Sequence, residues 1–308
     1  MSSKLDLHSL IVFYHVASEG SITAAAEKLC LTQPTVTYHI RSLEKNVGVK
    51  LLDIKKQKVF LTHAGKGLLR YVREIYQQMT GAERFLEGLK EASLRVGISA
   101  TFSSTVALAA AAFKELYPHV RLIVRSTSSF EVVEDVLNSQ VDLGIVVGVD
   151  YENHKLRQVE LSPREKLMLV ASPSSVISQK ERIRLSDLCG YPMVLGPETS
   201  ATRRILLNRL MTGGCHMPAP IIVEVNSLEW GMSLVVNGKG MSLYHSRDVE
   251  KEISEGRLKE LVLSNDIWVA ANALLRVDAP EHPMAEQFIA LVKEAFLTPN
   301  QALAVPSP

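Results

Sequence analysis

The sequence has 308 residues, 46% of them hydrophobic and 22% charged, and its formal net charge is +1. No apolar stretch is long enough to span a membrane, and the first apolar run is amphipathic and interrupted by His8 and His15, unlike a signal peptide. We therefore expect a cytoplasmic protein without a membrane partner.

The three cysteines are Cys30, Cys189 and Cys215, an odd number without CxxC spacing. This pattern predicts neither a disulfide framework nor a zinc site. We expect Cys30 to be a packing residue at the end of a buried helix. A redox-sensing role for Cys189 or Cys215 remains the alternative.

Residues 7–47 follow the order of a helix-turn-helix, a motif that inserts its second helix into the DNA major groove. Ser21 can cap a helix that contains the run Ala24–Ala26. Thr32 is a suitable N-cap for the next helix, and Pro34 falls in its first turn, where no N–H is needed. Apolar residues recur in this helix at the spacing of an inward face: Val36, Ile40 and Leu43.

The remaining positions of this second helix face outward. They are Gln33, Thr35, Thr37, Tyr38 and Arg41. Side chains of this length and hydrogen-bonding capacity suit a helix that contacts base edges. A small three-helix bundle with a polar face is the alternative.

Two short β-prone runs, 47–52 and 59–62, flank a basic segment and predict a hairpin, or wing. Lys55, Lys56 and Lys58 would lie beside phosphates, where they add affinity without sequence information. Residues 1–62 hold eight Lys/Arg against five Asp/Glu, so positive charge is concentrated at this end of the chain.

Residues 5–67 resemble the DNA-binding domain of LysR-type transcriptional regulators. The matching positions are Leu10, Phe13, Val16, Gly20, Ser21, Ala24, Ala25, Leu29, Thr32, Gln33, Pro34, Val36, Ile40, Leu43, Glu44, Gly48, Leu51, Leu61, Thr62, Ala64 and Gly65. The resemblance implies that Gln33, Pro34, Thr37 and Tyr38 approach base edges.

Two departures from the family pattern concern basic residues. The family usually has Leu-Phe-x-Arg where this chain has Leu51–Ile54, so the usual wing arginine is missing. Lys55 or Lys56 is the candidate replacement. Tyr38 stands where a basic residue is common.

Residues 64–92 contain no proline and predict one long helix. Its apolar residues alternate by four and three positions, as in a coiled-coil seam. They are Leu68, Val72, Ile75, Met79, Ala82, Leu86 and Leu89. We expect this stripe to bury against a second copy, giving a homodimer, with packing on the following domain as the alternative. The resemblance also implies a dimerising linker helix, and a tetramer formed through the effector domains.

From Ser93 onward, strand-like and helical segments alternate in a βαβαβ pattern that predicts parallel sheets. The expected strands are 94–99, 121–125, 142–147, 166–171, 193–195, 221–225, 241–244, 258–263 and 267–274, and the expected helices are 104–116, 131–139, 202–212, 228–237 and 283–296. This length suits two subdomains, joined near 161–165 and 264–267. The resemblance implies an effector domain shaped like a periplasmic solute-binding protein.

The predicted fold class is α/β with an N-terminal all-α winged helix-turn-helix, followed by two Rossmann-like subdomains. The expected boundaries are a DNA-binding domain at 1–63, a linker helix at 64–92, an effector-binding domain at 93–298 and a disordered tail at 299–308. Within the effector domain, subdomain I covers 93–162 and 267–298, and subdomain II covers 163–266.

Three Ser/Thr-rich segments, 99–104, 126–129 and 196–203, each follow a predicted strand and precede a helix. Helix N-termini at the carboxyl ends of parallel strands attract anions. The candidate effector-binding residues are therefore Ser99, Thr101, Ser103, Thr127, Ser128, Thr199, Ser200 and Thr202. In the alternative interpretation, each of these residues is only a helix cap.

Residues 199–203 also resemble a Gly-Ser-Gly-Thr-Arg stretch of family members that regulate carbon fixation and sulfur assimilation. Arg203 would give a bidentate hold on a carboxylate, a phosphate or a sulfur oxyanion. A solvated first-turn arginine is the alternative. Asn226 and Ser227 cap another helix and offer one more contact.

No P-loop, GxGxxG, HExxH or GxSxG motif occurs, so we expect no enzyme, no cofactor and no metal. The predicted function is that of a transcriptional regulator. Its partners are double-stranded operator DNA, a small anionic effector and its own copies. A solute-binding module would need a signal sequence and no DNA-binding domain, and an amino-acid-converting enzyme is a third candidate.

Overall fold

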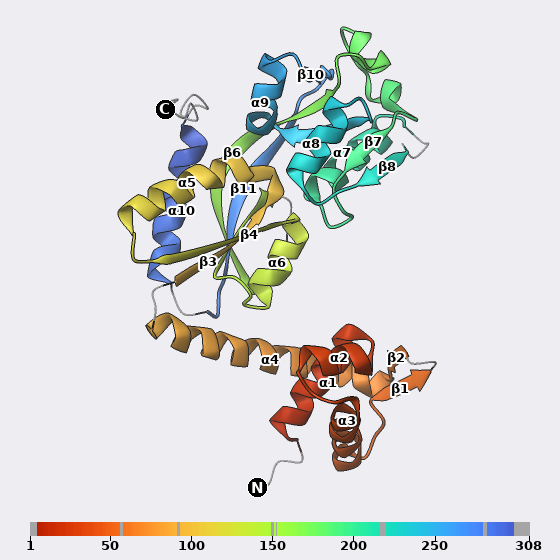
Figure 1. Ribbon diagram of the computed structural model, residues 1–308, viewed down its shortest axis with the longest axis vertical. Coiled ribbons are helices and arrows are strands. Elements are labelled where there is room, and N and C mark those ends of the chain that lie inside the picture. The colour runs from red at the N-terminus through yellow and green to blue at the C-terminus, as the bar shows by residue number, and fades with distance from the viewer. Residues whose placement is uncertain are drawn as a thin grey trace. The chain divides into compact units, whose positions relative to one another are not determined.

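The computed structural model of the chain describes residues 5–55, 58–90, 93–148, 151, 153–215, 220–279 and 282–298. They form two compact units, the first ending at Leu86 and the second beginning at Glu87 (Figure 1). The first unit is mainly helical and the second is α/β, as expected for the fold class.

The first unit contains three short helices, a hairpin and most of a long helix. In chain order these elements are α1 (Leu7–Glu19), α2 (Ile22–Lys28), α3 (Gln33–Val47), β1 (Leu52–Lys55), β2 (Lys58–Leu61) and α4 (His63–Lys90). Asp6, Ser21 and Thr32 precede the three short helices, and the side chain of each accepts a hydrogen bond from an amide in the first turn. The caps at Ser21 and Thr32 are those that the sequence predicts, and they explain where α2 and α3 begin; the cap at Asp6 was not predicted.

Helix α4 divides its apolar stripe between two environments. Val72 is 1% exposed and belongs to the core of the first unit, against which Leu68 also packs. Ile75 and Leu86 are instead 40% and 58% exposed. The expectation that the whole stripe faces a second copy is therefore wrong for Val72, which its own unit already covers.

The second unit has two lobes. Lobe I consists of β3 (Ser93–Ser99), η1 (Ala100–Phe102), α5 (Ser103–Leu116), β4 (Arg121–Thr127), α6 (Ser129–Leu137), β5 (Leu143–Gly148) and α10 (Pro283–Leu297). Lobe II consists of η2 (Val176–Gln179), η3 (Leu185–Leu188), β7 (Met193–Leu195), α7 (Ala201–Thr212), β8 (Ile221–Glu224), α8 (Leu228–Val236), β9 (Met241–His245), α9 (Ser246–Ser254) and β10 (Lys259–Glu260). Two long strands, β6 (Leu156–Ala171) and β11 (Ile267–Arg276), run between the lobes (Figure 1).

A single sheet passes through both lobes in the order β4-β3-β5-β11-β6-β9-β7-β8, with β10 paired to β6. Strands β4, β3 and β5 are parallel in lobe I, and β8, β7 and β9 are parallel in lobe II. The antiparallel pair of β11 and β6 joins the two parallel sets, with an irregular register between Val269 and Asn272. Parallel strands within each lobe confirm the expected α/β class, while the continuous sheet was not expected.

Three elements of the second unit differ from the expectation. Strand β6 begins at Leu156 rather than 166, because residues 156–162 pair with β11. Only Lys259 and Glu260 of the expected strand 258–263 are in a ladder. Helix α9 was not expected; it is strongly amphipathic, and Val249 is its buried residue. In each case a contact with a segment distant in the sequence decides the structure: the pairing of β6 with β11, the pairing of β10 with β6, or the burial of Val249.

The cysteines do not match the expectation. Cys189 follows η3 and Cys215 follows α7, and the structure joins them in a disulfide with their Cα atoms 5.4 Å apart. Twenty-six residues separate the pair in sequence, so only the fold brings them together. Cys30, expected to pack inside, is exposed, because α2 ends at Lys28 and the chain turns at Cys30 with a φ of 53°.

None of the described helices combines the length and apolar composition that crossing a membrane requires. The expected disordered tail, 299–308, lies outside the described residues, as does Lys56 of the expected wing.

Two glycines in the first turns of α4 provide a test of this packing. A Cβ on Gly65 would overlap the backbone carbonyl of Leu51, whereas a Cβ on Gly67 meets no atom within 4 Å. We expect Gly65→Ala to lower the free energy of unfolding by about 1–3 kcal/mol through overpacking. Gly67→Ala is the matched control and should raise it by up to about 1 kcal/mol through helix propensity. Denaturant titration of the full chain measures both, and equal effects would contradict the packing of Gly65.

Candidate functional site

Helix α3 presents most of the predicted DNA-contacting residues on its outer side. Val36, Ile40 and Leu43 are buried in the core of the first unit, which fixes the rotation of the helix about its axis. Among the predicted contacts, four side chains are exposed and two are half-buried. Gln33, Pro34, Tyr38 and Arg41 are the exposed residues, and Thr35 and Thr37 are the half-buried ones.

Thr35 has a local role as well. Its backbone amide donates to the Thr32 side-chain oxygen over 3.3 Å, and the two hydroxyl oxygens lie 2.8 Å apart. Thr35 therefore belongs to the N-cap of α3. Tyr38, in contrast, is 68% exposed, so its ring is accessible to a partner.

The hairpin of β1 and β2 forms the predicted wing. The backbones of Lys55 and Lys58 are paired in register across the hairpin, and the Lys58 side chain is exposed. The carboxylate of Glu44, near the end of α3, accepts hydrogen bonds from the amides of Leu51 and Leu52 at 2.8 and 3.1 Å. This charge-assisted contact ties the wing to α3.

A pocket lies between the two lobes of the second unit, at the carboxyl ends of strands from both. From lobe I, its wall includes the ends of β3 and β4; from lobe II, it includes the ends of β7 and β9 and the residues that follow β8. About 650 Å³ of space not filled by protein lies within its walls, open solvent at the mouth included. We call this space the interlobe pocket.

The structure brings six of the nine predicted effector-binding residues to the interlobe pocket. These are Ser99, Thr101, Thr127, Ser128, Ser200 and Thr202. Ser103, Thr199 and Arg203 are not part of its wall. Ser103 instead lies with its hydroxyl oxygen 3.4 Å from that of Ser126.

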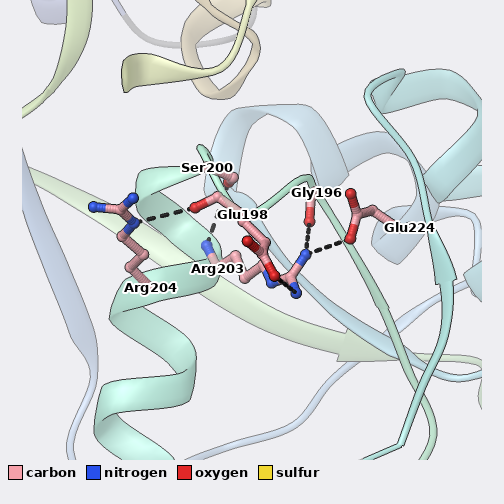
Figure 2. Close-up of polar contacts among 6 residues, drawn as sticks. All are labelled: Gly196, Glu198, Ser200, Arg203, Arg204 and Glu224. Carbon is pink, nitrogen blue, oxygen red and sulfur yellow. Dashed lines mark hydrogen bonds and ion pairs between the residues drawn. The ribbon is translucent and has the colours of Figure 1, made fainter. Parts of the chain in front are cut away.

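The Arg203 side chain makes its hydrogen bonds within lobe II. Figure 2 shows its guanidinium directed at the Gly196 carbonyl oxygen, 2.9 Å away, and at the Glu224 carboxylate, 2.6 Å away. The side chain is 11% exposed, so it is not the solvated arginine of the alternative prediction. In this arrangement Arg203 supports the loop before α7 rather than facing the pocket.

The neighbouring Arg204 links the lobes. Its guanidinium lies over the ring of Phe130 from α6, 3.9 Å from the centroid. Its Nε donates to the carbonyl oxygen of Glu198 (Figure 2). The amide of Phe130 donates to the carbonyl oxygen of Thr199 over 3.3 Å. Thr199 therefore serves as a backbone contact between the lobes.

Four helices of nine or more residues begin at the wall of the interlobe pocket. Their N-cap residues are Ser128 of α6, Ser200 of α7, Ser227 of α8 and His245 of α9. The first-turn amides of a helix carry partial positive charge and attract anions. The first turn also holds an acidic residue in three of these helices, Glu131, Glu229 or Asp248, whereas α7 has none.

The helix N-termini differ in whether an acidic side chain already balances the partial positive charge of their amides. In α6 the Glu131 carboxylate accepts from Thr127 and Ser128, and these hydrogen bonds, that of Thr127 first, hold the pKa of Glu131 below its ordinary value. Helix α7 has no acidic residue in its first turn, and the Ser200 and Thr202 hydroxyl oxygens lie 2.9 Å apart. The start of α7 is therefore better suited to receive an anion.

His245 and Asp248 also line the pocket, although neither is among the residues predicted from the sequence. His245 is fully buried, and its Nε2 lies 2.8 Å from the Glu165 carboxylate. Burial raises the pKa of Glu165, but hydrogen bonds from His245 and Ser162 outweigh it and leave that pKa lowered. Burial raises the pKa of Asp248 to about 6.

The signal that would have located both residues is helix α9, which begins directly after the strand expected at 241–244. Among the described residues, no group of three or more His, Cys, Asp or Glu side chains is placed to hold a metal ion.

Comparisons with known proteins agree on the family. Residues 7–66 match the bacterial regulatory helix-turn-helix protein, lysR family, and residues 87–297 match the LysR substrate binding domain. The chain is 29% identical over 300 residues to the HTH-type transcriptional regulator CbbR of Rhodospirillum rubrum, with 95% of this chain and 97% of that protein covered. It is also 29% identical over 265 residues to a probable RuBisCO transcriptional regulator of Phaeodactylum tricornutum, with 84% and 86% covered.

Among solved structures, the fold is similar to that of full-length CbnR in complex with its target DNA. The TM-score is 0.59 at 20% identity, with 94% of this chain and 100% of that chain covered. The two family matches cover both the helix-turn-helix and the two-lobed unit. The protein therefore belongs to the LysR family of transcriptional regulators.

Proposed function

We propose that this LysR-type regulator binds operator DNA through α3 of two subunits and that a small anionic metabolite in the interlobe pocket controls it. The observation that carries the proposal is the convergence of helix N-termini from both lobes on one pocket, among them the start of α7, which has no acidic residue in its first turn. Such an arrangement favours an anion that contacts both lobes at once.

The DNA-binding part rests on the outer side of α3. Gln33, Tyr38 and Arg41 are exposed and long enough to reach base edges, while Lys58 of the wing suits a phosphate contact. Glu44 fixes the wing to α3, so that both elements would meet the duplex together.

The proposed dimer rests on two apolar residues of α4 that remain exposed in the first unit. Ile75 and Leu86 lie eleven positions apart, three turns along one face of the helix. A second copy of α4 would cover them and pair two copies of α3 for two half-sites. A dimer is therefore part of the proposal.

The effector part rests on the start of α7. We place the anionic group of the ligand against the Ser200 and Thr202 hydroxyls, with Ser99, Thr101, Thr127 and Ser128 facing it from lobe I. A ligand that touches both lobes shifts the equilibrium between two lobe orientations only as far as it binds one orientation more tightly than the other. The coupling free energy of such ligands is typically about 1–3 kcal/mol.

The first prediction concerns DNA recognition. We expect Gln33→Ala or Thr37→Ala to weaken specific binding by about 1–3 kcal/mol, because each removes a base contact. Gel-shift titration against the intergenic DNA upstream of the gene measures the change. The control is Gln78→Ala, the same substitution at an exposed position of α4, which should leave affinity unchanged. Unaltered footprints for both α3 variants, with normal thermal stability, would refute the assignment.

The second prediction concerns assembly. Ile75→Asp combined with Leu86→Asp should dissociate the dimer and abolish operator binding together, because charged side chains would be buried in the seam. Analytical ultracentrifugation reports the mass. Arg73→Asp, at an exposed position of the same helix, is the control. If the unmodified protein sediments as a monomer at micromolar concentration, the dimer is wrong.

The third prediction concerns the pocket. Ser200→Ala combined with Thr202→Ala should remove the thermal stabilisation that phosphate, sulfate or propyl phosphate gives to the wild-type chain, and should preserve basal operator binding. Thr202→Ala alone keeps the α7 cap and should have a partial effect. Thr212→Ala, at the other end of α7, is the control. Retained anion stabilisation in the double variant would mean that these hydroxyls act only as caps.

A further inference from the structure

We propose that the ligand of the interlobe pocket also carries a hydrogen-bond donor, a hydroxyl or an amine, which binds His245 and Asp248 where α9 begins. This inference rests on the proposed function, because it concerns a second group of the same ligand. It narrows the effector class from small anions to anions that bear a hydroxyl or amino group.

The first observation is the unused nitrogen of His245. The side chain is fully buried in the pocket wall, and its Nε2 lies 2.8 Å from Glu165 Oε2. Because hydrogen bonds hold Glu165 as a carboxylate, this nitrogen carries the proton. In the neutral ring Nδ1 is then an acceptor, and none of the described residues donates to it.

The second observation is the unused oxygen of Asp248. This residue lies in the first turn of α9, and its Oδ1 accepts from the Ser104 hydroxyl of lobe I over 2.5 Å. Its Oδ2 is buried, and no donor from the described residues reaches it. A pKa raised to about 6 by burial leaves the carboxyl mainly ionised at neutral pH.

Two buried acceptors without partners, on residues that line the same pocket, determine which group of a ligand can bind beside them. A buried polar atom without a partner costs about 1–3 kcal/mol, so a donor that reaches either atom gains that amount. A second carboxylate or phosphate would be repelled by Asp248 and Glu165. The start of α7, without an acidic residue in its first turn, has the opposite preference. The same pocket therefore suits a ligand with an anion at one group and a donor at another.

The hydrogen bond from Ser104 to Asp248 joins the two lobes and would therefore take part in switching between lobe orientations. It belongs to α5 of lobe I, whereas Asp248 and His245 belong to lobe II. The Phe102 ring, also from lobe I, makes a T-shaped contact with the His245 ring at a centroid distance of 5.4 Å. A donor held by Asp248 thus binds at an existing contact between the lobes.

The test uses alkyl phosphates that differ only at their far end. Propyl, butyl and pentyl phosphate are compared with their terminal hydroxyl and terminal amine derivatives by calorimetric titration of the full chain. At the chain length that fits, we expect the hydroxyl or amine derivative to bind about tenfold more tightly than the methyl compound. Asp248→Asn should sharply reduce the preference for the amine derivative, because an amide whose oxygen keeps Ser104 presents NH₂ in place of Oδ2 and cannot accept from an ammonium group, whereas the hydroxyl derivative can still accept from that NH₂.

The outcomes separate the two proposals. If all the phosphates bind the wild type equally at every chain length, or if Asp248→Asn keeps the full preference for the amine derivative, the donor site is wrong while the anion site stands. If no phosphate binds the wild type, or if the Ser200/Thr202 double variant binds as tightly as the wild type, the proposed anion site fails. Asp53→Asn on the wing is the matched control, and thermal melting verifies folding. Should Asp248→Asn not fold, the comparison within the wild type decides.

Discussion

The antiparallel pair of β6 and β11 is the constraint on which the two-lobed unit depends. Strand β11 pairs with β5 of lobe I, β6 pairs with β9 of lobe II, and the two strands pair with each other from Ile267 to Arg276. Backbone hydrogen bonds therefore continue from one lobe to the other, so the lobes can reorient only by bending or twisting these strands. The register shifts between Val269 and Asn272 are the natural place for such a change.

This connection also determines where the pocket lies. Each lobe has its own parallel strands with helices that start at their carboxyl ends, and the joined sheet brings both sets of ends to one space. Two of the charged side chains near these ends are already paired within the protein. Glu131 accepts from Thr127 at α6, and Arg203 binds Glu224 before α7. At the start of α7 the pocket thus offers backbone amides and hydroxyls to an anion, rather than charged side chains.

The lobes also touch directly. The Phe130 amide donates to Thr199, Arg204 covers the Phe130 ring, and Ser104 donates to Asp248. A cation–π contact or a single hydrogen bond is worth about 1 kcal/mol. The coupling expected of a ligand, about 1–3 kcal/mol, is of the same size. A small molecule can therefore compete with these contacts and change the balance between lobe orientations without disrupting either core.

The sequence alone determined the features that depend on local interactions. The caps at Ser21 and Thr32, the period of α3 and the strand–helix alternation after Ser93 indicated the two units and the Ser/Thr residues near the pocket. Only the tertiary structure decided which atoms meet across long separations. It extended β6 along β11, bound Arg203 to Glu224, buried Val72 within its own unit and joined Cys189 to Cys215. It also placed His245 against Glu165, eighty residues away. The hydrogen-bond capacity and the periodicity of a segment follow from the sequence of that segment alone. The partner of a buried side chain depends instead on how distant segments pack.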